Sequence, residues 1–96
     1  MRKFLISFDL NTSIDNGRTN DYSLVDNIIK KLGYCCKPLA NTYLVATNSY
    51  DCKSIRDEVM KVLTAKDFIL VVEIGTAFAS FNYNDKNIEI RNLLSK

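Results

Sequence analysis

The order of strand-like and helix-like patterns constrains this chain more than any other feature. Strand-like patterns cover residues 3–9, 34–40, 42–47 and 68–74, and helical patterns cover 21–32 and 51–63. The order is therefore strand, helix, strand, strand, helix, strand. Two successive βαβ units of this kind predict an α+β, ferredoxin-like (βαββαβ) fold, with a four-stranded antiparallel sheet and both helices on one face.

The topology rules also predict which strands are central. Right-handed crossovers place the first and third strands in the middle and leave the second and fourth at the edges. Pro38 agrees with this, because a proline cannot donate to a central ladder and is typical of an edge strand. The chain has 96 residues, the usual size of one domain, so we expect a single domain over residues 1–96.

Local signals mark the ends of both helices. Asn20 or Asp21 can cap the first helix, Gly33 follows it as a C-terminal stop, and Asp51 can cap the second. Apolar residues at helical spacing predict the buried face of each helix. These residues are Leu24, Val25, Ile28, Ile29 and Leu32 in the first helix, and Ile55, Val59, Val62 and Leu63 in the second.

The fourth strand, FILVVEI over residues 68–74, is unusually apolar for an edge, and an exposed apolar edge invites association. Residues 77–83 predict a short fifth strand. Residues 84–95 predict a polar terminal helix that carries Ile88, Ile90, Leu93 and Leu94. We expect this extra C-terminal strand and helix to cover an edge of the sheet, either its own or that of a second copy.

Composition narrows the classes of function. The chain is 47% hydrophobic and 25% charged, which indicates a globular protein, and no apolar run is long enough to span a bilayer. There is no histidine and no C-x-x-C spacing, so a zinc site is not expected. Cys35 and Cys36 are adjacent, and neighbours in a strand point to opposite faces, so they are not expected to pair. The three cysteines predict reduced thiols in a cytoplasmic protein.

Asp9 is the leading candidate for a functional side chain. It lies where the first apolar strand leaves the sheet, beside a long polar loop over residues 10–20. A carboxylate there can hold a divalent metal or a catalytic water, or can instead accept backbone N–H groups of the next turn. Polar loop residues could line the same site or could simply be solvated. They are Asn11, Thr12, Ser13, Asp15 and Arg18.

Basic residues offer a weaker signal for nucleic acid. The net charge is only +2, and a dedicated binder usually carries a denser basic patch. Lys30, Lys31 and Lys37 are candidates for contact with a nucleic-acid backbone, and an ordinary solvated surface is the alternative. Tyr22, Tyr34, Tyr43 and Tyr50 could stack on bases or pack in the core.

Short motifs give the chain a resemblance to a known family. The opening FLISFDLN resembles the start of small ferredoxin-like proteins of the Cas-two-like and VapD superfamily. The middle segment LANTYLVATNSYDCKSIRDEV is similar to the SinR-like branch, at Asn41-Thr42-Tyr43-Leu44-Val45 and Ile55-Arg56-Asp57. The sequence departs from the family pattern in two ways. Basic residues are sparse in the tail, and Cys35-Cys36 stand where paired tryptophans are common before the second strand of the hairpin.

The resemblance implies a homodimer whose C-terminal strand pairs with the sheet of its partner. It also implies that Asp9 binds a divalent metal, such as Mg²⁺, together with its symmetry mate. Members cleave RNA or DNA, or bind a duplex without cleaving it. The expected function is therefore a nucleic-acid-handling homodimer, either a metal-dependent phosphodiesterase or a non-catalytic one. The alternative is a protein-binding adaptor or inhibitor from a mobile element or a defence system.

Overall fold

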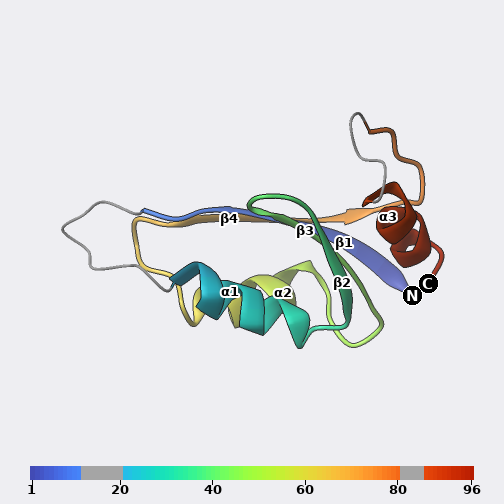
Figure 1. The fold of residues 1–96 in the computed structure, drawn as a ribbon. Coiled ribbons are helices and arrows are strands. Elements are labelled where there is room, and N and C mark those ends of the chain that lie inside the picture. Colours follow the sequence, from blue (N-terminus) through green and yellow to red (C-terminus); the bar gives the residue numbers. More distant parts are fainter. Residues whose placement is uncertain (12–20, 81–85) are drawn as a thin grey trace.

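In the part of the chain that the structure describes, the fold combines one sheet with three helices (Figure 1). The structure is a computed structural model and describes residues 1–11, 21–80 and 86–96. Its elements are β1 (Arg2–Asp9), α1 (Asp21–Lys30), β2 (Tyr34–Leu39), β3 (Thr42–Thr47), α2 (Cys52–Met60), β4 (Phe68–Ile74) and α3 (Lys86–Leu94). No helix in these ranges is long and apolar enough to cross a bilayer.

The sheet has four strands in the order β2-β3-β1-β4, and every neighbouring pair is antiparallel. The predicted α+β class and four-stranded antiparallel sheet are confirmed, and the arrangement is compatible with a ferredoxin-like fold. Pro38 lies in β2 at one edge, where the register with β3 shifts between Cys36 and Leu39. β4 forms the other edge and pairs with β1 along its whole length.

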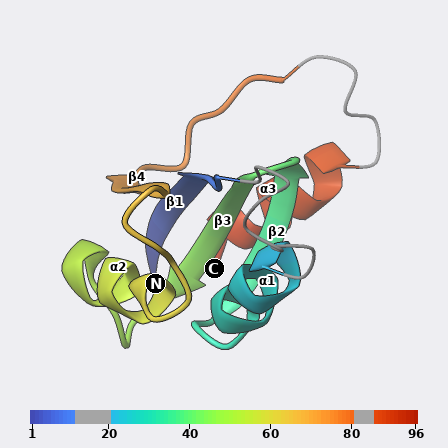
Figure 2. The ribbon, with the colours of Figure 1, turned by 90° about the vertical axis from the view of Figure 1, so that its left-hand side faces the viewer.

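One face of the sheet holds the larger core, and we call it the helix face. Figure 1 and Figure 2 show α1 and α2 side by side along it. Strand alternation directs every second residue of β1 and β3 toward these helices. The resulting cluster is almost fully buried and contains Phe4, Ile6, Phe8, Tyr43, Val45, Val25, Ile29, Ile55 and Val59. Tyr43 stacks on Phe8 at 6.0 Å between ring centroids, so this tyrosine belongs to the core.

The opposite face, which we call the second face, is covered by α3 only in part. Ile90, Leu93 and Leu94 of α3 are buried against Leu44 and Ala46 of β3. The predicted terminal helix is therefore present, and it covers part of a face of the sheet over β2 and β3, where we had expected it to cover an edge. Ile88 of the same helix is 61% exposed. Of the proposed fifth strand, residues 77–80 form no strand, and residues 81–83 lie outside the described chain.

The first helix ends earlier than predicted, and Gly33 serves a different purpose. The helix stops at Lys30, and the chain continues in a tighter turn in which the Leu32 N–H donates to the carbonyl of Ile29 at 3.0 Å. Gly33 lies against β3, where a Cβ atom would be 2.4 Å from the carbonyl oxygen of Ala46. Close approach to the sheet thus requires glycine. Leu24 was assigned to the apolar face but is 45% exposed.

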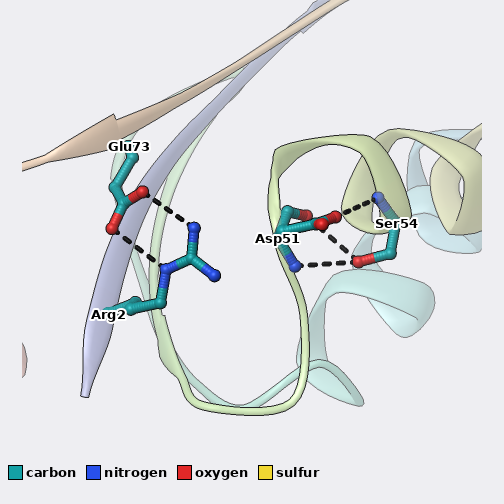
Figure 3. A network of polar contacts seen from close by, with 4 residues as sticks. All are labelled: Arg2, Asp51, Ser54 and Glu73. Atoms are coloured by element: carbon teal, nitrogen blue, oxygen red, sulfur yellow. Dashed lines mark hydrogen bonds and ion pairs between the residues drawn. The ribbon is translucent and has the colours of Figure 1, made fainter.

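The cap of the second helix is confirmed. The Asp51 carboxylate accepts from the Ser54 backbone N–H at 2.8 Å, and the Ser54 hydroxyl accepts from the Asp51 N–H at 2.8 Å (Figure 3). This helix ends at Met60, whereas the sequence pattern extends to Leu63. Figure 3 also shows Arg2 of β1 pairing with Glu73 of β4 through two hydrogen bonds of 3.1 and 2.9 Å.

Candidate functional site

Asp9 lies on the second face, at the end of β1 that α3 does not cover. Its register partner is Phe68, the first residue of β4, so both side chains point to the same side of the sheet. Asp9 is exposed, and within the described residues no hydrogen-bond donor reaches its carboxylate. Together with Ser7, Phe68 and Leu70, Asp9 lines a shallow hollow of about 240 Å³. The carboxylate is therefore open to a ligand that approaches the second face.

The described residues of one copy do not build a complete metal site at Asp9. The described residues contain no group of three or more carboxylate, cysteine or histidine side chains that could hold an ion. Mg²⁺ keeps several of its waters and is usually bound by one or two carboxylates together with substrate phosphates. Asp9 supplies one such carboxylate, and the Asp9 of a second copy could supply another.

The nearby Asp67 has a structural role that the sequence analysis missed. Its Oδ1 accepts from the Asn11 backbone N–H at 2.8 Å, and its Oδ2 accepts from the Thr64 backbone N–H at 2.7 Å. Asp67 thus joins the segment after β1 to the turn before β4. Asp67 therefore accepts the kind of backbone N–H bonds in a turn that were the alternative expectation for Asp9. A carboxylate three residues after Thr64, at the start of an apolar strand, was the available signal.

The polar loop residues are only partly described. Asn11 is half-buried and donates its backbone N–H to Asp67. Ser13 and Arg18, like Thr12 and Asp15, lie outside the described residues.

The candidate lysines do not gather around Asp9. Lys30 pairs with Asp26 at 2.8 Å on α1, and Lys37 lies 5.5 Å from the centroid of the Tyr43 ring. Lys31 is exposed just after the end of α1. Because Tyr43 belongs to the helix face, Lys30 and Lys37 lie around the Asp26–Tyr43 contact, whereas Asp9 lies on the second face. The described residues therefore form no single basic surface that includes Asp9.

A small polar network lies at the centre of that group. The Tyr43 hydroxyl donates a hydrogen bond to Asp26, which also accepts from Lys30. The Lys30 hydrogen bond and then that of Tyr43 lower the pKa of Asp26. Burial, followed by the Asp26 hydrogen bond, raises the pKa of Tyr43. This network ties α1 to the sheet, and its groups are already paired with one another.

The cysteines are free, and two of them face opposite ways as predicted. Cys35 packs against the helix-face core, and Cys36 packs against the cluster under α3. Burial raises the pKa of the Cys36 thiol to about 11 and also raises the pKa of Cys35. Both thiols are therefore protonated near neutral pH, which does not favour nucleophilic chemistry.

An exposed row of apolar side chains runs along β4 beside Asp9, on the second face. Phe68, Leu70 and Val72 are 70%, 59% and 38% exposed, and we call these three residues the β4 stripe. Their register partners across the sheet are Asp9, Ser7 and Leu5. Alternation in the strand directs all three to the second face, because Leu5 packs under α3 on that face. The stripe and Asp9 thus form one continuous surface.

The chain matches no protein-family model, no curated protein and no solved structure. The resemblance to the Cas-two-like and VapD superfamily therefore stays a prediction that depends on short motifs and on a compatible fold.

Proposed function

We propose that this chain works as a homodimer that handles nucleic acid, and that two copies meet through the β4 stripe. The carrying observation is the stripe itself, since three large apolar side chains lie exposed in one row next to Asp9. Contiguous apolar surface of this kind marks interaction sites more often than isolated apolar residues do. Soluble proteins most often assemble as two-fold symmetric dimers, in which one patch contacts its own copy.

The proposed contact would bring a second carboxylate close to Asp9. In a two-fold dimer a residue near the axis lies close to its own mate, and Asp9 borders the stripe. Two Asp9 carboxylates close to this axis would form the pair that Mg²⁺ binds together with substrate phosphates. A divalent cation there would stabilise charge on a phosphodiester under attack. The substrate would then be RNA or DNA.

The proposal includes a finer assignment of the fold. The strand order, together with α1 and α2 on one face, supports a ferredoxin-like domain extended by α3. We place it in the Cas-two-like superfamily, closest to the SinR-like branch, on the opening segment that ends in Asp9 and on the β3–α2 segment.

Replacement of Asp9 tests the catalytic part. We expect the wild-type chain to cleave RNA or DNA with Mg²⁺ or Mn²⁺, and we expect Asp9→Asn to lower the rate by at least about a hundredfold, as for loss of a metal ligand. Asp57→Asn is the matched control, because Asp57 is an exposed carboxylate of α2 whose ion pair is with its neighbour Arg56. Equal rates for wild type and Asp9→Asn, or no cleavage by the wild type, would remove the catalytic claim.

Binding without cleavage is tested separately. A nucleic-acid-handling dimer should bind RNA or DNA with an affinity that falls steeply as salt is raised, because binding releases counterions. Absence of any salt-dependent binding would leave the second candidate, a non-catalytic adaptor or inhibitor. Among the described residues no strand pairs with the outer edge of β4, and this favours that candidate, because an exposed edge can accept a strand from another protein.

A further inference from the structure

The side of β4 that faces α2 is incompletely covered. Helix-face side chains of the central strands, such as Phe4 and Val45, are fully buried, whereas Ile69 and Val71 of β4 are only half-buried. Between α2 and β4 lies a groove of about 350 Å³, lined by Cys52, Lys53, Arg56, Ile69, Leu70 and Val71. The helix layer therefore stops short of the edge of the sheet and leaves room beside β4.

The edge that borders this groove can accept another strand. β4 is the last strand of the sheet and pairs only with β1 among the described residues. In an antiparallel pair, alternate residues direct their N–H and C=O groups away from the partner, so an edge strand presents a row of unpaired groups. β4 has no proline or lysine, and its one charged residue, Glu73, is held by Arg2 at 2.9 Å. Proline and lysine, two of the usual protections of an edge strand, are thus absent from β4.

The helix wall of the groove is basic. Lys53 and Arg56 are three residues apart on α2, so they lie on the same side of the helix, and both line the groove. Arg56 contacts Asp57 at 3.0 Å, but both side chains are about half exposed, and a surface pair of this kind contributes little. Lys53 makes no ion pair within the part of the chain that the structure describes. The charge of this wall therefore favours an acidic ligand.

We propose that the groove between α2 and the free edge of β4 binds an extended segment of another protein in which acidic and apolar residues alternate. Side chains of an added strand point alternately to the two faces of the sheet. On the second face, the apolar residues would continue the β4 stripe. On the helix face, the acidic residues would meet Lys53 and Arg56. Main-chain hydrogen bonds to β4 would supply affinity, and the alternation would supply specificity.

The test uses the full chain and a short capped peptide, as long as β4, in which valine and glutamate alternate. We expect saturable binding, with amide NMR shifts concentrated in β4 and on the groove side of α2. The double variant Lys53→Glu with Arg56→Glu should weaken binding by roughly tenfold or more. A peptide in which valine and lysine alternate should bind poorly to the wild type and better to this double variant. These outcomes do not depend on whether Asp9 binds metal.

Matched controls separate the proposed mode from general charge attraction. The double variant Lys31→Glu with Arg91→Glu makes the same charge change on exposed residues away from the groove and should keep wild-type affinity. N-methylation of alternate peptide residues on the pairing side should abolish binding, because it removes main-chain donors. The proposal is overturned if the valine–glutamate peptide does not bind, if the groove variant binds as the control does, or if the methylated peptide binds equally well.

Discussion

At the scale of single residues, the structure depends on a few positions where chemistry leaves little choice. Gly33 is one of them, because the chain passes so close to β3 that even one methyl group has no room. Asp26 is another, because it joins Lys30 on α1 to the hydroxyl of the buried Tyr43. The hydrophobic pattern locates Tyr43 in a strand, but no local pattern reveals that its hydroxyl meets a carboxylate from a different element.

The two glycines with described surroundings give a matched pair of substitutions. Gly33→Ala should lower the free energy of unfolding by about 1–3 kcal/mol, because the new Cβ would lie 2.4 Å from the Ala46 carbonyl oxygen and must push backbone aside. Gly75→Ala should be neutral or stabilise by up to about 1 kcal/mol, since no described residue other than its chain neighbours lies within 4 Å of its Cβ position. Urea denaturation followed by circular dichroism measures both. Equal effects would contradict the close approach at Gly33.

Asp26 predicts a particular dependence of stability on pH. Its pKa in the folded chain is lowered, first by Lys30 and then by Tyr43, so its ionised form stabilises the fold above the unfolded value of about 4. That contribution is lost as the pH falls through the lower, folded pKa. Asp26→Asn should therefore lose less unfolding free energy than wild type between neutral pH and about pH 3. If the free energy of unfolding of Asp26→Asn fell as steeply below neutral pH as that of the wild type, Asp26 would not contribute to this pH dependence.

At the scale of elements, the sequence predicts well which helices and strands form, but it predicts poorly where the helices end. Strong alternation in β1 and the β-branched run of β4 locate those strands within a residue, and the predicted cap Asp51 locates the start of α2. Both helices end two or three residues earlier than predicted, because the last apolar residues lie in a tighter turn that follows each helix. Leu32 and Val62 follow α1 and α2 in such turns, with N–H groups bonded to the third preceding carbonyl.

The capping box gives a prediction at this scale. Asp51→Ala removes the acceptor for the Ser54 N–H and should destabilise the fold by about 1 kcal/mol. Asp57→Ala removes only an exposed ion pair inside the same helix, so it should change the free energy of unfolding by less than about half that amount. Thermal or urea unfolding of both variants provides the comparison. If Asp57→Ala lowered the free energy of unfolding more than Asp51→Ala, the cap would not be the main stabilising interaction at the start of this helix.

At the scale of the whole molecule, the placement of α3 determines which surface stays open. The sequence predicted a terminal apolar helix but not its position, because periodicity identifies an apolar side of a helix and not the partner that it meets. The helix covers β2 and β3 on the second face, so Phe68, Leu70 and Val72 remain exposed. The candidate site was likewise predicted only in part. Asp9 was found from its place at a strand end, whereas its apolar neighbours on β4 emerge only from the strand register.

Sedimentation equilibrium over a concentration series, on wild type and on Leu70→Glu, tests the proposed assembly most directly. We expect the wild type to have the mass of two chains and Leu70→Glu to have the mass of one, because a charge in the middle of the β4 stripe cannot be buried unpaired. Ile88→Glu, at an exposed apolar residue of α3, should remain dimeric. A monomeric wild type, or a Leu70→Glu variant that dimerises as the wild type does, would contradict the β4 stripe as the contact between copies.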